Sequence, residues 1–161
     1  MAHPALETRS RLPRLRVNPA ATSPVHFSRA LCHRLRTEAA AQPTREVCGL
    51  IGARDGVASA HYPIANIAPD AHRRYHMEPA AQIAAFRAMR LRGETLAAIY
   101  HSHPAGPPSP SQRDLCEWSY PEALCLIVGL AGGRPRLRAW RWSPAGFAPV
   151  RLDACGERAR P

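Results

Sequence analysis

The stretch that most constrains the fold is residues 123–130 (ALCLIVGL), a short apolar run without a single charge. A continuous apolar run of this length is typical of a buried strand, and residues 95–101 (TLAAIYH) form a second one. Arg54-Asp55-Gly56 is a hairpin turn signal between two further strands, residues 46–53 and 57–64. A closing hairpin is expected over residues 137–142 and 147–152.

Helical patterns alternate with these strands. Ser28 is suited to cap a helix that runs through residue 41, Pro79 opens a second helix, and Ser111 caps a third that ends near residue 118. Residues 74–78 are expected to add a short strand. Alternating helices and strands, with hairpins at both ends, predict an α/β fold: a mixed β-sheet flanked by helices.

The chain length fits one domain, because domains typically have roughly 100–200 residues. Residues 1–24 are rich in Pro, Ala and Arg and have no apolar periodicity, so they are predicted to be a disordered basic leader. The domain is expected to span residues 25–152, followed by a short C-terminal tail at residues 153–161.

The formal net charge is +10, and every basic residue other than histidine is arginine. A nucleic-acid partner is not expected, because the arginines are dispersed and no aromatic-interleaved basic stripe is present. No stretch approaches the ~20 apolar residues that span a bilayer, and no secretory pattern follows the start, so a cytoplasmic protein without a membrane partner is expected. The five cysteines are scattered, without a C-x-x-C pair; free thiols are expected rather than a disulfide framework or a cysteine zinc site.

The segment that carries chemistry is Tyr100-His-Ser-His-Pro104, followed by Ser111-Gln-Arg-Asp114. Two histidines at i and i+2 of an extended segment, His101 and His103, project to the same face and can reach one metal ion. Asp114, in the first turn of the next helix, can supply a carboxylate oxygen. Two imidazoles and one carboxylate leave a fourth tetrahedral position open, which is the mark of a catalytic zinc site.

A catalytic zinc site also needs a group that takes and returns protons. Glu46 is the candidate, at the start of a strand and close to the small Gly49. Ser111 could donate a hydrogen bond to the oxyanion of a tetrahedral intermediate while it also begins a helix. Each of these residues has an ordinary structural interpretation on its own. The hypothesis depends on their combination at fixed spacing, with an upstream E-x-C-G-L sequence.

On these residues the sequence resembles the JAMM (MPN-positive) metallopeptidases, in particular the compact bacterial branch that acts on ubiquitin-like sulfur-carrier proteins. The resemblance covers about residues 25–152. It implies a cytidine-deaminase-like JAB/MPN fold and one zinc per chain, held by His101, His103 and Asp114. It also implies that Glu46 is the acid/base residue, bound to the water rather than to the metal, and that Ser111 stabilises the oxyanion.

The function expected from this resemblance is zinc-dependent hydrolysis of a peptide or isopeptide bond. The bond would follow the Gly-Gly end of a small ubiquitin-like sulfur-carrier protein, and cysteine made on the carrier would be one leaving group. Three alternatives stay open: a JAMM peptidase of cell-wall or phage-tail processing, a RadC-like DNA-associated protein, and a non-catalytic zinc-binding module. A structural zinc site would need neither Glu46 nor Ser111.

Overall fold

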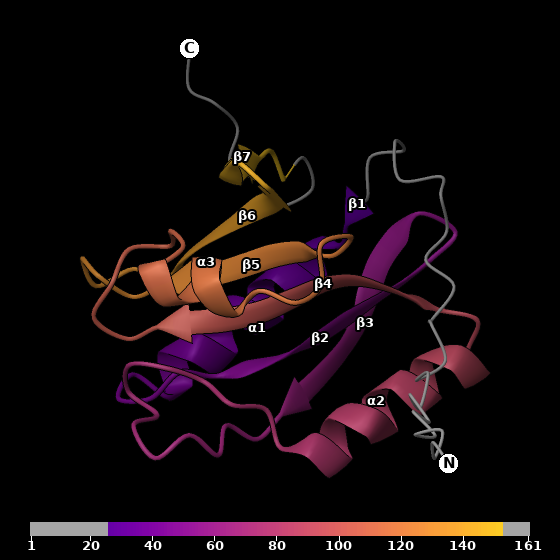
Figure 1. The fold of residues 1–161 in the computed structure, drawn as a ribbon, viewed down its shortest axis with the longest axis horizontal. Coiled ribbons are helices and arrows are strands. Elements are labelled where there is room, and N and C mark those ends of the chain that lie inside the picture. Colours follow the sequence, from indigo (N-terminus) through magenta and orange to yellow (C-terminus); the bar gives the residue numbers. More distant parts are fainter. Residues whose placement is uncertain (1–25, 153–161) are drawn as a thin grey trace, which may run out of the picture.

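A seven-stranded sheet organises residues 26–152, the part of the chain that the computed structural model describes (Figure 1). Its strands lie in the order β1-β3-β2-β4-β5-β6-β7. The strand bounds are β1 His26–Phe27, β2 Cys48–Arg54, β3 Val57–Ile64, β4 Thr95–His103, β5 Leu124–Gly129, β6 Arg136–Ser143 and β7 Gly146–Val150. No helix among the described residues is long and apolar enough to cross a membrane.

The sheet is mixed, as predicted. β2 pairs antiparallel with both β3 and β4, and β5, β6 and β7 form an antiparallel meander. The central β4 and β5 run parallel, with His103 at the end of β4 opposite Gly129 at the end of β5. Since parallel neighbours need a crossover, the chain leaves the end of β4 and returns through α3 (Gln112–Glu117) before it enters β5.

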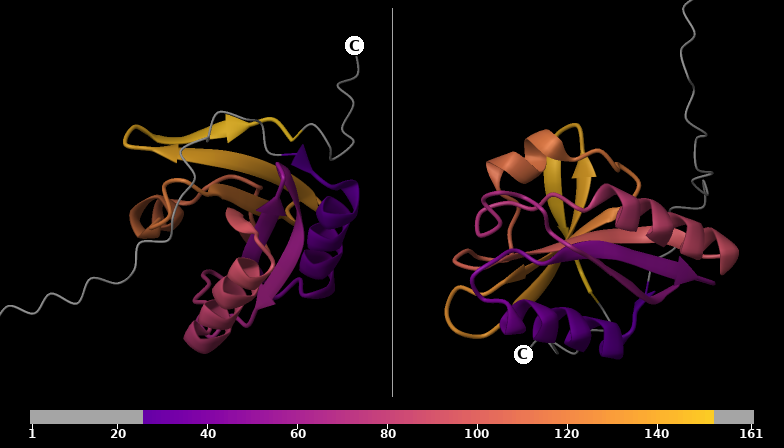
Figure 2. Two further views of the ribbon diagram at one scale, coloured as in Figure 1. Left: turned by 90° about the vertical axis from the view of Figure 1, so that its right-hand side faces the viewer. Right: turned by 90° about the horizontal axis from the view of Figure 1, so that it is seen from below.

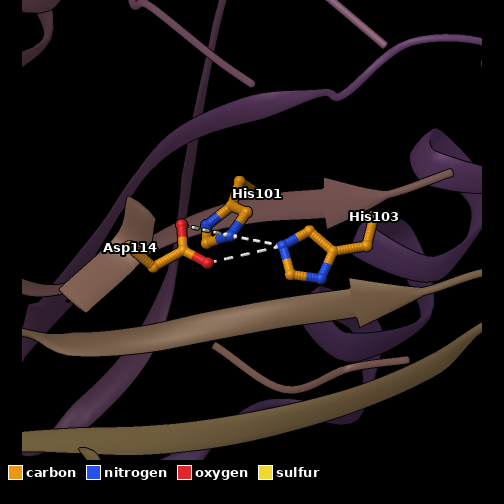
Figure 3. A group of neighbouring side chains, drawn as sticks. All are labelled: His101, His103 and Asp114. Atoms are coloured by element: carbon orange, nitrogen blue, oxygen red, sulfur yellow. Dashed lines mark hydrogen bonds and ion pairs between the residues drawn. The ribbon is translucent and has the colours of Figure 1, made fainter. Parts of the chain in front are cut away.

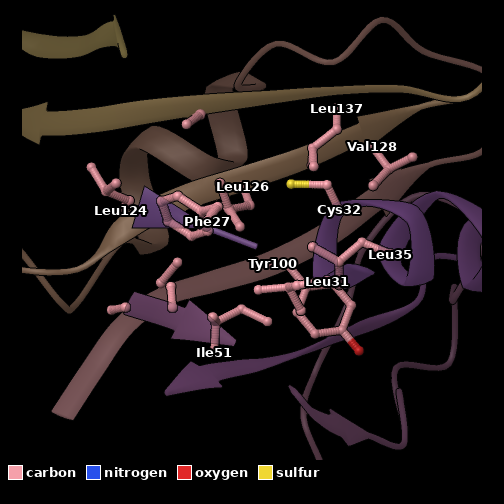
Figure 4. Packing of buried hydrophobic residues seen from close by; sticks show 14 of the residues in the cluster. Phe27, Leu31, Cys32, Leu35, Ile51, Tyr100, Leu124, Leu126, Val128 and Leu137 are labelled. Atoms are coloured by element: carbon pink, nitrogen blue, oxygen red, sulfur yellow. The ribbon is translucent and has the colours of Figure 1, made fainter. Parts of the chain in front are cut away.

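Helices cover both faces of the sheet (Figure 2). α1 (Arg29–Ala41) lies on one face, while α2 (Pro79–Leu91) and α3 lie on the other. Ser28 caps α1 as predicted, because its hydroxyl accepts a hydrogen bond from the backbone N–H of Leu31 at 3.2 Å. The apolar side of α1 packs with the sheet into the larger core, which includes Tyr100 of β4 (Figure 4).

Alternation along β4 separates the two faces. Tyr100 belongs to the core beneath α1, whereas Ile99 packs in the smaller core beneath α2. Since side chains alternate along a strand, His101 and His103 fall on the Ile99 face, beneath the crossover that returns through α3. The fold therefore positions the predicted metal ligands on the face opposite α1.

Some details of the sequence-based prediction were wrong. Residues 74–78 do not form a strand; Met77 makes only an isolated bridge with Asn66, because the remaining backbone of this segment follows a loop. The short β1, which pairs parallel with β3, was not expected as a strand. Among the cysteines, Cys48 and Cys125 are buried free thiols, but Cys116 is exposed and Cys32 is disulfide-bonded. The predicted leader and tail, residues 1–24 and 153–161, lie outside the described residues.

Candidate metal centre

Two imidazoles at the end of β4 turn toward the same point (Figure 3). The Nε2 atoms of His101 and His103 lie 3.1 Å apart. His101 is fully buried and His103 is partly buried. Two ring nitrogens this close repel each other unless a proton or a cation lies between them, so the arrangement favours a positive charge at this position.

Asp114 completes the cluster from α3. Its Oδ1 atom lies 3.2 Å from His101 Nε2, and its Oδ2 atom lies 3.5 Å from His103 Nε2. These three side chains form the one group within residues 26–152 whose ligand atoms all lie within 4.8 Å of one another and could hold a metal. Two imidazoles and one carboxylate are a donor set that suits zinc and leaves a coordination position open. The residues therefore fit the predicted zinc ion.

Electrostatics at the cluster follow from burial and from the mutual contacts. Complete burial lowers the pKa of His101, because desolvation disfavours the charged imidazolium. Burial acts in the same direction on His103, but hydrogen bonds with Asp114 and the Pro107 carbonyl outweigh it and raise the pKa. Burial alone would raise the pKa of Asp114, yet the hydrogen bonds from both histidines and from Ser111 hold it far below its ordinary range. Asp114 is therefore ionised at neutral pH.

The orientation of His103 is set by the loop that follows it. Its Nδ1 atom lies 3.0 Å from the carbonyl oxygen of Pro107, so Nδ1–H donates there; in the neutral ring this leaves the lone pair of Nε2 facing the cluster, where a metal can bind. Trp140 Nε1–H holds the same loop by donating to the Pro108 carbonyl at 2.9 Å. Gly129 allows this packing, because a Cβ there would lie 2.7 Å from Pro108 Cδ and closer still to the Pro108 nitrogen.

His101 is held by a different contact. Its Nδ1 atom is buried and has no hydrogen-bond partner within the described residues. The ring of Tyr75 stacks on the imidazole instead, with centroids 4.8 Å apart and an interplanar angle of 25°. Sequence reasoning missed this role of Tyr75, because nothing in the local pattern of residues 74–78 indicates a long-range aromatic contact.

Glu46 lies two residues before β2 with 5% of its surface exposed. Burial raises the pKa of its carboxyl to about 7, while the nearby His103 lowers it and Asp114 raises it. A carboxyl group that titrates near neutral pH can both accept and return a proton there. The structure therefore brings the predicted acid/base residue into the neighbourhood of the metal cluster, in a suitable electrostatic state.

Two side chains that sequence reasoning did not assign hold the backbone around Glu46. Ser102, buried between the two histidines in sequence, accepts a hydrogen bond from the Val47 N–H at 2.9 Å through its Oγ. Asn66 donates from Nδ2 to the Glu46 carbonyl at 2.9 Å and to the Arg74 carbonyl at 3.0 Å. Neither role could be predicted from local spacing, because both hydrogen bonds join segments far apart in the sequence.

A family model describing prokaryotic homologs of the JAB domain matches residues 28–143. The chain belongs to this family. The resemblance predicted from Glu46, His101, His103, Ser111 and Asp114 is thereby confirmed, since all five lie within the matched span.

Two named relatives and two solved structures are similar to this JAB-domain protein. It is 32% identical over 114 residues to a desampylase from Haloferax volcanii, covering 70% of this chain and 80% of the relative. It is 34% identical over 112 residues to a Thermus thermophilus protein named "Probable TtuB-protein conjugate cleaving protease", covering 68% and 73%. The structure of a protein from Desulfitobacterium hafniense superposes with a TM-score of 0.68 at 26% identity, covering 78% of this chain and 88% of the other. A Salinibacter ruber protein gives 0.61 at 26% identity, covering 84% and 94%.

Ser111 of the JAB-domain protein caps α3 and bonds to Asp114. Its hydroxyl donates to Asp114 Oδ2 at 2.7 Å, its backbone N–H donates to the same oxygen at 2.6 Å, and its Oγ accepts from the Asp114 N–H at 3.2 Å. This reciprocal capping box is the ordinary structural interpretation of the residue. It also fixes the rotamer of Asp114, so Ser111 positions a candidate ligand while lying at the edge of the site.

A pocket of about 250 Å³ opens beside the cluster. The loop between β3 and α2 forms one wall and α3 with the following residues forms the other; Glu46, Ser111 and Asp114 line it together. Trp118 lines this pocket and also packs against the smaller core. Cys48 has a structural role: its thiol donates to the Ile64 carbonyl at 3.4 Å, and burial raises its pKa to about 12. Gly49 allows close packing of the Tyr62 carbonyl oxygen and the Tyr100 ring, which occupy the space that a Cβ atom at residue 49 would need.

Proposed function

We propose that this JAB-domain protein is a zinc-dependent peptidase that hydrolyses a peptide or isopeptide bond at the Gly-Gly end of a ubiquitin-like carrier. The observation that carries the proposal is the buried Glu46, with a pKa of about 7, in one pocket with Asp114 of the His101–His103–Asp114 cluster. A structural metal site needs no buried carboxyl group that titrates near neutral pH. This argues against the non-catalytic zinc-binding module.

His101, His103 and Asp114 would hold the zinc ion, one per chain. When bound, zinc supplies a Lewis acid that polarises a scissile carbonyl and makes water acidic enough to attack it at neutral pH. The protein contributes the rigidity of this site, because both histidines are on β4 and Asp114 is fixed by Ser111.

Glu46 would move the proton. In its ionised form its carboxylate accepts a proton from the attacking water, and the resulting carboxylic acid returns the proton to the leaving amine. A pKa near the working pH serves both steps, since neither form of the group is strongly favoured over the other. Ser111 would donate to the oxyanion; its hydroxyl would then have to leave Asp114 Oδ2, to which it donates in this structure.

The substrate class is proposed from the relatives. One is named for cleaving TtuB-protein conjugates and another is named desampylase. We infer that this chain also acts on a ubiquitin-like protein, and we propose a sulfur carrier, with cysteine made on the carrier as one leaving group. The catalytic unit would be residues 25–152, and the matched family span of residues 28–143 supports this boundary.

The experiment that tests the proposed function combines a measurement of zinc content with a cleavage assay. The purified protein is loaded with zinc and incubated with a ubiquitin-like carrier extended beyond its Gly-Gly end, and the products are identified by mass spectrometry. Cleavage directly after the second glycine, with about one zinc per chain and loss of activity in a chelator, is expected. A protein that retains no zinc after titration, or that leaves every extended carrier intact, would exclude the proposal.

A further inference from the structure

Three arginines line the pocket beside the metal cluster. Arg113 comes from α3 and lies 3.7 Å from the carboxylate of Glu117. Arg73 and Arg74 come from the opposite wall, and within residues 26–152 neither guanidinium has an ion-pair or hydrogen-bond partner. Other arginines of this chain do have such partners: Arg45 donates to the Asn66 carbonyl and Arg92 to the Tyr62 hydroxyl.

The backbone that carries these two side chains is held firmly. The Arg74 carbonyl accepts from Asn66 Nδ2 at 3.0 Å, and the Arg74 N–H donates to the Asp70 carbonyl at 3.2 Å. The next residue, Tyr75, is the one whose ring stacks on His101. A half-buried arginine is therefore fixed one residue away from a contact with a candidate metal ligand, so little order has to be imposed when a ligand binds.

The acidic groups of the pocket do not neutralise this pair. The carboxylate of Asp114 is engaged by two histidines and Ser111, and Glu117 faces Arg113. Glu46 lines the same pocket, but within the described residues no carboxylate forms an ion pair with Arg73 or Arg74, so both leave unpaired positive charge at the pocket wall. A planar guanidinium with several donors matches the two oxygens of a carboxylate, which makes a carboxylate the ligand of matching shape and charge.

We propose that Arg73 and Arg74 bind a carboxylate on the substrate residue that follows the scissile bond. Placing the carboxylate after the scissile bond, rather than before it, rests on the proposed function. A Gly-Gly acyl end carries no charge, so the departing residue is the source of the carboxylate. The group could be the α-carboxylate of a C-terminal residue or the side chain of an acidic residue. These two arginines would then be residues that determine specificity, while the chemistry remains with Glu46 and the metal cluster.

The test compares three carriers that differ only after the Gly-Gly end: one with Ala and a free carboxylate, one with Ala and a carboxamide, and one with Asp and a carboxamide. A carboxylate-bearing carrier is expected to be cleaved about 10- to 100-fold better in kcat/KM than the neutral carrier, the range of a charge-assisted hydrogen bond. Preference for the first carrier identifies the α-carboxylate as the source, and preference for the third identifies the acidic side chain.

In Arg73→Gln and Arg74→Gln the preference should collapse, because kcat/KM for the carboxylate-bearing carriers falls toward that for the neutral carrier. Arg87→Gln is the matched control: it removes the same charge from an exposed position of α2 outside the pocket, and it should retain the full preference. Zinc content and thermal unfolding of all three variants check that the fold and the metal site are intact. A preference that survives in both pocket variants, or three carriers cleaved equally, overturns the inference while the proposed function stands.

Equilibrium binding of the same carriers to the Glu46→Gln protein separates the two proposals. If no carrier is cleaved by the unmodified enzyme but a carboxylate still improves binding in a manner that requires Arg73 or Arg74, the inference stands and the proposed function fails. Equal binding of all three carriers, or no binding at all, overturns the inference whatever the cleavage assay shows.

Discussion

The hydroxyl of Ser102 accepts a hydrogen bond of 2.9 Å from the backbone N–H of Val47, across 55 positions of sequence. The Ser102 N–H donates in turn to the Val47 carbonyl at 3.0 Å. The strand that carries both histidines is thus fastened to the residue beside Glu46. This relationship sets the distance between the proposed proton carrier and the proposed metal site.

Ser102→Ala should therefore lower activity and stability together. It leaves the buried Val47 N–H without its acceptor, which costs about 1–3 kcal/mol of unfolding free energy. Chemical denaturation measures the stability, and single-turnover cleavage at saturating zinc measures the rate. Ser59→Ala, at an exposed position of β3 outside the pocket, is the control and should change neither quantity. Full stability in Ser102→Ala would show that the Val47 N–H finds another acceptor.

Metal content and rate should separate in variants of the site. Asp114→Ala removes a proposed ligand, so zinc affinity and activity both fall. Glu46→Gln retains zinc while the rate drops by roughly 10²–10⁴, the usual contribution of general acid–base catalysis. Ser111→Ala also retains zinc and loses roughly 10²–10³, as for the removal of one oxyanion donor. Loss of zinc in Glu46→Gln would make Glu46 a ligand and refute the mechanism.

The metal-free protein should become less stable as the pH rises from about 4.5 to 7. The folded-state pKa of Glu46, about 7, lies above the ordinary value of 4.5, so folding favours the protonated carboxyl group. Below both values the group has no effect, and above both it costs up to about 3 kcal/mol. Glu46→Gln should thus be more stable than the native chain at pH 8 and equal to it at pH 4, by denaturation in a chelator. An equal difference at both pH values would contradict the raised pKa.

Gly129→Ala should weaken zinc binding although residue 129, which pairs with His103 between β4 and β5, supplies no ligand atom. The added Cβ would press on Pro108 and displace the loop whose Pro107 carbonyl orients His103. Loss of such outer contacts typically costs about 10- to 100-fold in metal affinity. Trp140→Phe, which removes the donor to the Pro108 carbonyl without a clash, should show a smaller loss in the same direction. Competition with a zinc-sensitive dye measures both, and native affinity in Gly129→Ala would rule out this route.

Deleting residues 1–24 should leave folding unchanged, since nothing in this segment has the apolar pattern of a buried element. Thermal unfolding and zinc content of the shortened chain measure this. A clear loss of stability would move the domain boundary toward the N-terminus.

The three proposed zinc ligands could be predicted from local spacing. His101 and His103 share a face because side chains alternate along any strand, and Asp114 is brought back by a short loop and the first turn of a helix. The helix cap at Ser28 and the hairpin turn at Arg54-Asp55-Gly56 could also be predicted from the sequence, since helix capping and turn formation depend on adjacent residues. The prediction of a strand at residues 74–78 was wrong because the conformation of this segment depends on its contacts with Asn66 rather than on its own sequence pattern.

By itself the sequence determined the fold class, the order of the elements and the residues that could bind zinc, because periodicity, capping and motif spacing act over a few positions. Only the tertiary structure decided that Glu46 is buried with a pKa near neutrality and that Tyr75 covers His101. It also decided that Arg73 and Arg74 line the pocket without an ion-pair or hydrogen-bond partner among residues 26–152. These properties arise from desolvation and from contacts between segments far apart in the chain, so no local pattern encodes them.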